Sequence, residues 1–351
     1  TQNVIMYGPK AYIQFHGVDE YDLELAVKID SYPEFAPLLQ KLIANVNANI
    51  QKQFEIIPPK RGTNVQEIID IVKDLQLFNP PYIDVTSHSA EAYYEEDGEG
   101  MVKRHIRKKR PGTISICGII QNRFKIDTVP HLLCRGFTKE ETEDAMIELN
   151  YLGIHNVLAI RGDETNYKKP IQSGRSANIY ASDLVMQLNN LRSGKYLDEI
   201  LNADSMDLCI GVGGYPEKHF EAPNLKKDIE FLKNKVDAGA DYIVTQMFFN
   251  NEDFFNFKSE CRAVGIKVPI VPGLKILNST KQLSSIPKNF YVNIPNELSS
   301  EIEQDPKNVQ EIGINWCIKQ SEELLNNGVQ NIHYYIMNGA KSVTKVLKSF
   351  I

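Results

Sequence analysis

The sequence predicts one α/β domain, a (β/α)8 barrel of the TIM type with an N-terminal extension. From residue 53 onward, short apolar runs alternate with longer amphipathic segments, and this unit occurs eight times. Glycines follow several amphipathic segments, directly before the next apolar run. A chain of 351 residues with 42% hydrophobic content is also long enough to bury the core of a closed barrel.

The apolar runs are short and rich in Val and Ile, as is typical of strands buried on both faces of a parallel sheet. The predicted strands span residues 53–57, 82–86, 128–134, 156–161, 207–212, 242–248, 268–272 and 331–336. The predicted helices span residues 65–75, 138–152, 181–191, 225–238, 251–263 and 308–327.

Two segments do not fit the repeat directly. Residues 113–120 have a β-like composition, but a barrel needs its second helix there, so we expect a helix. Residues 290–294 are expected to form a stray strand within a loop. Residues 1–50 form the extension before the barrel domain of residues 51–351. Within it, residues 34–46 either form a helix that closes the bottom of the barrel or are loosely ordered.

Composition narrows the function classes. A net charge of −6 argues against a general nucleic-acid-binding protein, because phosphate neutralisation needs a basic surface. The five cysteines are scattered without a Cys-x-x-Cys pair, which is typical of a reduced cytoplasmic protein. No signal sequence and no apolar run of about 18 residues is found, so no membrane attachment is expected. The basic run at residues 103–110 is predicted to be a solvated surface loop.

Glu55 interrupts the first predicted strand between Phe54 and Ile56. An acid flanked by apolar residues is partly desolvated, which raises its pKa and suits it to donate a proton near neutral pH. A salt-bridged structural glutamate is an equally good interpretation of the local sequence.

Asp163 ends an Arg-Gly-Asp triplet that directly continues the strand at 156–161. Adhesive use of such a triplet needs a flexible exposed loop, so a functional carboxylate at a strand end is the better interpretation. Taken alone, Asp163 could also be a helix cap or an ion-pair partner of Arg161.

Further polar residues follow other predicted strands. Tyr215 and His219 follow a glycine-rich turn where a ligand can approach the backbone. Gln246 lies beside aromatic residues, and its amide can pair with the edge of a heterocycle. His131 stands alone on an apolar strand, where a satisfied core residue is more common than a ligand. No cluster has the spacing of a metal site, and no serine-hydrolase elbow occurs.

Six motifs in chain order carry a family resemblance. They are Phe54-Glu55-Ile56-Ile57-Pro58-Pro59, Val129-Pro130-His131-Leu132, Ala159-Ile160-Arg161-Gly162-Asp163, Tyr180-Ala181-Ser182-Asp183-Leu184-Val185, Tyr215-Pro216-Glu217-Lys218-His219 and Thr245-Gln246-Met247-Phe248-Phe249. Together they resemble the methylenetetrahydrofolate reductase family, from about residue 53 to residue 341.

This resemblance implies an FAD-containing oxidoreductase that reduces 5,10-methylenetetrahydrofolate to 5-methyltetrahydrofolate with NADH or NADPH, for methionine synthesis. Both substrates would take turns at one flavin face, and a homo-oligomer is expected. Glu55 would be the general acid that protonates N10 of the folate, and Asp163 would favour the resulting cation. Gln246 would meet the pterin and the nicotinamide in turn, and Gln282 would be a further substrate contact.

The resemblance also implies a set of flavin contacts at the strand ends and in the loops that follow them. They are Thr86, His131, Arg161, Gly162, Asp163, Tyr180, Ala181, Tyr215, His219, Ala222, Asp228 and Lys235.

The chain departs from the family pattern at several positions. Gly339 replaces an arginine that contacts the folate, and Lys341 is a candidate substitute. Phe231 and Asn234 stand where polar or basic flavin contacts are expected, and Ser87 follows Thr86 in place of a glycine-rich turn. The alternative functions are a proline-dehydrogenase-like flavin barrel and a flavin-binding subunit without turnover. The basic run could also attract polyglutamylated folate or a nucleotide phosphate.

Overall fold

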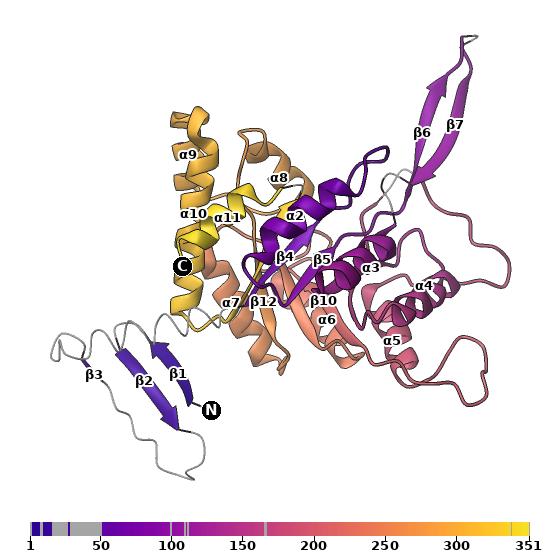
Figure 1. Cartoon of the computed structure of the whole chain (residues 1–351), viewed down its shortest axis with the longest axis horizontal. Helices are drawn as coiled ribbons and strands as arrows, with labels where there is room; N and C mark the ends of the chain where they lie inside the picture. Colours follow the sequence, from indigo (N-terminus) through magenta and orange to yellow (C-terminus); the bar gives the residue numbers. More distant parts are fainter. Residues whose placement is uncertain are drawn as a thin grey trace.

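A closed barrel of eight parallel strands forms the body of the computed structural model (Figure 1). The structure describes residues 2–7, 10–15, 27–28 and 51–350, except residues 99, 109, 111, 165–166 and 338. Around the barrel the strands follow the order β4-β5-β8-β9-β10-β11-β12-β13, and β13 pairs with β4 to close it. Helices follow the strands and cover the outside, so the predicted (β/α)8 fold is confirmed.

All eight barrel strands overlap their predicted ranges. They are β4 (Gln51–Ile56), β5 (Tyr82–Val85), β8 (Asp127–Leu133), β9 (Asn156–Ile160), β10 (Cys209–Gly214), β11 (Tyr242–Met247), β12 (Ile270–Leu274) and β13 (Asn331–Met337). The helices are α2 (Gln66–Gln76), α3 (Thr113–Phe124), α4 (Lys139–Tyr151), α5 (Ala181–Arg192), α6 (Leu225–Asp237), α7 (Asn251–Ala263), α8 (Gln282–Phe290), α9 (Asn296–Gln304), α10 (Val309–Asn326) and α11 (Lys341–Lys348). One 3-10 turn, η3 (Pro306–Asn308), leads into α10.

The helix expected at residues 113–120 is confirmed by α3, in which Ile116, Cys117 and Ile120 are buried. Burial of this apolar face against the sheet overrides the β-like composition. The strand expected at residues 290–294 is wrong. Helix α8 runs to Phe290, and Tyr291 ends it with a left-handed φ of 57°.

The basic run at residues 103–110 was expected to be a surface loop, but most of it forms a strand. Strands β6 (Ala90–Glu96) and β7 (Val102–Lys108) form an antiparallel hairpin that extends away from the barrel (Figure 1). One face of the hairpin pairs an acidic strand with a basic one, as in Arg107 with Glu91 at 3.8 Å. These cross-strand charge pairs stabilise extended backbone in a segment whose composition suggested only solvation.

Ahead of the barrel, β1 (Gln2–Tyr7), β2 (Lys10–Phe15) and β3 (Val27–Lys28) form an antiparallel three-stranded sheet that the sequence analysis did not predict. The helix expected at residues 34–46 lies outside the described residues.

The strand residues divide between two apolar layers. In β4, for example, Phe54 and Ile56 are fully buried in the large core between the strands and the surrounding helices. A second, smaller cluster of Val129, Leu158, Val244 and Val271 comes from alternate positions of four other strands. Because successive strand residues point to opposite faces, this second cluster fills the interior of the barrel.

The same alternation places polar side chains inside the barrel. Val129 belongs to the inner cluster and Tyr82 packs against it. Asp84 on β5 lies two residues after Tyr82, and His131 on β8 lies two residues after Val129, so both side chains point to the same inner side. Glu55 alternates with the outward Phe54 and Ile56. Ionisable residues of three adjacent strands therefore stand above the inner apolar layer, toward the carboxyl ends of the strands.

Two simpler sequence expectations are also tested by the described residues. All five cysteines are free, and four of them are buried. Within the described part of the chain, no helix combines the length and the apolar character that a membrane crossing needs.

Two helical glycines allow the packing of the barrel helices to be tested. A Cβ added to Gly313 in α10 would overlap the backbone carbonyl oxygen of Leu277, whereas one added to Gly118 in α3 would lie 3.3 Å from a methyl of Leu152. Alanine gains about 1 kcal/mol of helix propensity over glycine at either position.

We expect Gly313→Ala to lower the free energy of unfolding by about 2 kcal/mol, because overpacking against rigid backbone outweighs the gain in propensity. Gly118→Ala is the matched control and should be neutral or stabilising, since the Leu152 side chain can adjust. Urea denaturation followed by circular dichroism measures both. Equal effects of the two substitutions would contradict the close packing of α10.

Candidate functional site

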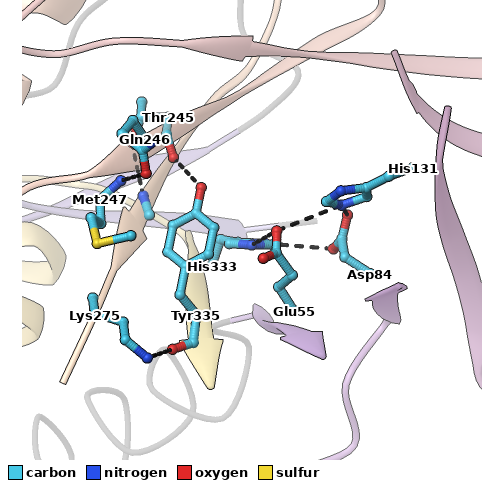
Figure 2. Close-up of polar contacts among 10 residues, drawn as sticks. Glu55, Asp84, His131, Thr245, Gln246, Met247, Lys275, His333 and Tyr335 are labelled. Carbon is cyan, nitrogen blue, oxygen red and sulfur yellow. Dashed lines mark hydrogen bonds and ion pairs between the residues drawn. The ribbon is translucent and has the colours of Figure 1, made fainter. Parts of the chain in front are cut away.

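Four ionisable side chains meet inside the barrel: Glu55 on β4, Asp84 on β5, His131 on β8 and His333 on β13 (Figure 2). Their side chains are 12%, 0%, 5% and 0% exposed, respectively. We call these four residues the acid cluster. Neighbouring strands supply them, since Glu55 pairs with Asp84 in the register of β4 and β5.

Carboxylates and imidazoles alternate around the acid cluster. Nε2 of His131 lies 3.5 Å from Glu55 Oε2 and 3.7 Å from Asp84 Oδ1. His333 closes the circuit, with Nε2 at 3.7 Å from Glu55 Oε2 and Nδ1 at 3.5 Å from Asp84 Oδ2. Each carboxylate therefore faces both imidazoles. Among the described residues, no group of His, Cys, Asp and Glu is arranged to hold a metal ion.

The sequence analysis predicted a raised pKa for Glu55, and the structure corrects this direction. Burial alone raises the pKa of Glu55, but the approach of His333 and the charges of His131 and Lys275 outweigh burial and hold the pKa below its ordinary value. Neighbouring cations were not visible in the local sequence. Glu55 is therefore paired with basic side chains, as the interpretation as a structural glutamate expected. Its position in the barrel interior also suits proton transfer.

The pKa of His131 is raised. Burial lowers it, but the approach of Asp84 and the negative charges of Glu55 and Asp84 act more strongly in the opposite direction. His131 was expected to be either a flavin contact or a satisfied core residue. The structure places its Nε2 between the two carboxylates of the acid cluster.

Lys275 follows β12 and is only 6% exposed. Its ammonium donates a hydrogen bond to the backbone carbonyl of Tyr335 at 2.9 Å (Figure 2). Burial lowers the pKa of Lys275 to about 8, against the opposing charge of Glu55. Tyr335 in turn donates from its hydroxyl to the Thr245 carbonyl at 2.6 Å, which connects β13 to β11.

Lys275 also lines a cavity of about 630 Å³. Gln282, expected to contact substrate, lines the same cavity, and so do Gly339 and Lys341. Gln282 accepts hydrogen bonds from the backbone N–H groups of Asn278 at 2.6 Å and Ser279 at 3.1 Å, so it also holds the loop that precedes α8. A Cβ at Gly339 would meet open space.

Gln246 occupies an inward position on β11, two residues after Val244 of the inner cluster (Figure 2). Its Oε1 accepts a hydrogen bond from the backbone N–H of Met247 at 2.9 Å, which fixes the orientation of the amide.

A second group of predicted residues gathers around the loop after β10. Asp228 on α6 accepts a hydrogen bond from the backbone N–H of His219 at 2.8 Å. Lys235 lies about two helical turns after Asp228 on α6 and donates a hydrogen bond to the carbonyl of Gly213 at 2.6 Å. Burial lowers the pKa of Lys235 to about 8 and raises the pKa of Asp228, and each group's charge opposes the effect of burial on the other.

Aromatic rings and an ion pair complete this loop. The rings of Tyr215 and His219 meet edge to face, with centroids 4.7 Å apart. Ala222 is buried, and its carbonyl accepts a hydrogen bond from Lys218 at 3.1 Å. Lys218 has a φ of 126°, a strained backbone conformation for a residue other than glycine.

The Arg-Gly-Asp segment lies beside the same loop. Arg161 forms an ion pair with Glu221 at 2.7 Å, so the proposed pairing of Arg161 with Asp163 is not what the structure shows. Asp163 itself is exposed, in the loop that follows β9. Gly162 has a φ of 85° and packs against Leu133.

The remaining predicted contacts lie elsewhere at the same end of the barrel. Tyr180 is the N-cap residue of α5 and is 58% exposed, and Ala181 is the first residue of that helix. Thr86 directly follows β5, and its buried Oγ1 has no hydrogen-bond partner. Phe231 and Asn234 are both exposed on α6.

Sequence reasoning missed Asp84, His333, Lys275 and Tyr335. The signal for Asp84 and His333 was present, because each is an ionisable residue within an apolar run, the same observation that singled out Glu55. Lys275 lies one residue after its strand, and nothing local distinguished it from a surface lysine.

The family model and the relatives that the chain matches point to the same protein family. The chain matches the family model described as Methylenetetrahydrofolate reductase over residues 38–350. It is 31% identical to the 5,10-methylenetetrahydrofolate reductase of Buchnera aphidicola subsp. Schizaphis graminum, over 90% of this chain and 97% of that protein.

Two eukaryotic relatives differ in the nicotinamide that their names state. Methylenetetrahydrofolate reductase (NADH) 1 of Arabidopsis thaliana is 31% identical over 84% of this chain and 47% of its own length. The probable methylenetetrahydrofolate reductase (NADPH) of Caenorhabditis elegans is 28% identical over 90% of this chain and 45% of its own length. The chain thus spans about half the length of the eukaryotic relatives it matches.

The effect of Lys275 on the acid cluster can be measured directly. We expect Lys275→Met to raise the pKa of Glu55, because the substitution removes a buried cation that favours the carboxylate. The carbonyl stretch of protonated Glu55, followed by difference infrared spectroscopy against pH, should persist to higher pH in the variant. Glu55→Gln identifies the band.

Lys281→Met is the matched control, because Lys281 is exposed in the same segment of the chain. It should leave the titration of the band unchanged. An identical titration in Lys275→Met and the unsubstituted protein would contradict the coupling.

Proposed function

Because the chain belongs to the methylenetetrahydrofolate reductase family, we propose that it reduces 5,10-methylenetetrahydrofolate to 5-methyltetrahydrofolate, with FAD as cofactor and NADH or NADPH as reductant. The observation that carries this proposal is the buried Glu55 with three basic side chains around it, at the carboxyl-terminal end of a barrel where active sites of this fold lie.

The residues present fit a flavin. Thr86 Oγ1 is a buried hydroxyl without a partner at the end of β5, as expected for a group that bonds a ligand. A Cβ at Gly213 would meet open space on the inward side of β10, so the backbone there is approachable. Lys235 and Arg161 offer positive charge near the loop after β10, which suits a pyrophosphate.

Each group of residues then has a part in the reaction. FAD, when bound, supplies the hydride-transfer chemistry that no side chain of the protein can perform. Tyr215 and His219 of the loop after β10, and Asp228 on α6, would hold the cofactor across the strand ends, together with the other predicted contacts. Gln246 would orient the two substrates in turn through its amide, and Gln282 would contact the folate from the adjoining cavity.

Glu55 would transfer its proton to N10 of the folate, which opens the five-membered ring and leaves a cation on the substrate. Asp163 would favour that cation through its negative charge. A low pKa of Glu55 in the resting protein is compatible with this role, because His131, whose pKa is raised, lies 3.5 Å from the carboxylate and can supply the proton.

An anaerobic experiment tests the function and the role of Glu55 together. Purified protein with FAD and reduced nicotinamide should lose its yellow flavin colour and regain it when methylenetetrahydrofolate is added. We expect Glu55→Gln to bleach normally and to slow the recolouring by about 10²- to 10⁴-fold, the usual contribution of general acid catalysis.

Glu67→Gln on the exposed face of α2 is the control and should recolour at the normal rate. Equal loss of both half-reactions in Glu55→Gln would make Glu55 structural. A protein that never binds flavin, or that recolours only with a proline-derived acceptor, would overturn the proposal.

We expect Asp163→Asn to slow folate reduction by about tenfold while the thermal unfolding midpoint stays unchanged, because an exposed charge is partly screened by solvent. Stopped-flow measurement of the folate half-reaction gives the rate. Glu164→Gln is the matched control, since the neighbouring Glu164 is exposed and pairs with Arg135 at 3.0 Å. An unaffected rate in Asp163→Asn would return the triplet to a structural role.

A further inference from the structure

Asp84 has no part in the mechanism described so far, although it is fully buried at the centre of the acid cluster. Both of its carboxylate oxygens are buried without a hydrogen-bond partner, and each faces a different imidazole. A carboxylate in this position is costly unless it favours positive charge on its neighbours.

Several other ionisable side chains interact with the charge of Asp84. Besides the acid cluster, they are Tyr82 on β5, Tyr242 on β11, Tyr335 on β13 and Cys117 on α3. Burial raises the pKa of all four of these side chains, and Asp84 adds to the rise, so they are neutral through the physiological range. Among the described residues, His131 and His333 are the basic side chains that contact the carboxylate of Asp84, whereas Lys275 interacts with Glu55.

The two carboxylates differ in one respect that matters for proton transfer. Glu55 must be neutral when it acts as a general acid, and it then no longer attracts protons to the imidazoles. Asp84 is the remaining carboxylate of the cluster at that moment. Asp84 is fully buried, whereas the Glu55 side chain is 12% exposed, so a substrate reaches Glu55 first.

We propose that Asp84 is a positioning residue that holds His131 and His333 in place and keeps His131 protonated, so that the His131 imidazolium holds the proton that Glu55 delivers to the folate. The proton moves from Nε2 of His131 to Oε2 of Glu55, 3.5 Å away, and Asp84 keeps its contact with His333. The proposal rests on the proposed function for its kinetic part, and on the acid cluster alone for its protonation part.

The kinetic test uses Asp84→Asn, which keeps the shape and removes the charge. We expect folate reduction to fall about tenfold at pH 8 and to stay within about twofold of the unsubstituted enzyme at pH 6, because one pH unit corresponds to a tenfold change in the protonated fraction. Bleaching by nicotinamide should not change. Asp127→Asn is the control, since Asp127 is exposed at the opposite end of β8.

Restoration of the alkaline rate by Asp84→Glu would support a charge effect. A uniform loss at all pH values in Asp84→Asn would indicate a merely structural role and overturn the proposal. So would an unchanged pH profile.

The second test needs neither flavin nor substrate. Nitrogen-15 NMR of the histidine side chains in the protein without added ligands should show His131 losing its proton at lower pH in Asp84→Asn than in the unsubstituted protein. Unchanged titrations would overturn the proposal even if activity fell.

Should Asp84→Asn fail to fold, His333→Asn provides the same information. Asp84 then faces a single imidazole, and His131 should hold its proton to higher pH than before, because a competing cation is gone. An unchanged His131 titration in that variant would also overturn the proposal. If the unsubstituted protein reduces no folate at any pH, the proposed function fails, while the NMR titration still decides the role of Asp84.

Discussion

The interior of the barrel has to balance its own charges, and this constraint explains much of the site. Each of two carboxylates lies 3.5 to 3.7 Å from each of two imidazoles, and the four side chains have little or no solvent contact. Burial of any one of these charges alone would be strongly unfavourable. Because acidic and basic side chains alternate around the cluster, each one lowers the cost of burying its neighbours.

The alternation of strand side chains makes this arrangement possible. Outward positions such as Phe54 and Ile83 pack beneath the helices, and inward positions such as Val129 and Val244 form an apolar floor within the barrel. Charged side chains on the next inward positions stand above that floor, where the effective dielectric constant is low. Electrostatic interactions among them are therefore stronger than the same contacts would be at the surface.

The sequence was sufficient for the barrel because its signals are local and repeated eight times. The helix at 113–120 was predicted only through the requirement of the repeat, and the burial of Ile116 and Ile120 shows why that requirement prevailed. The β6–β7 hairpin was missed because its stability depends on cross-strand pairs that no local window contains. Glu55 lies on the strand where the sequence predicted it, but the direction of its pKa depends on residues from β8, β13 and the segment after β12, which only the fold brings together.

The division of the barrel mouth into two regions follows from which strands supply them. The acid cluster comes from β4, β5, β8 and β13, whereas the ion pair of Arg161 and the ring contact of Tyr215 with His219 follow β9 and β10. A flat ligand lying across the strand ends would touch both regions, so its binding would exclude water from Glu55 and strengthen every charge interaction there. Lys275 lines the cavity and also interacts with Glu55. A substrate bound in that cavity would therefore change both the electrostatic field at Glu55 and the access of water to Glu55. Binding and protonation are therefore physically coupled in this site through the charge of one lysine.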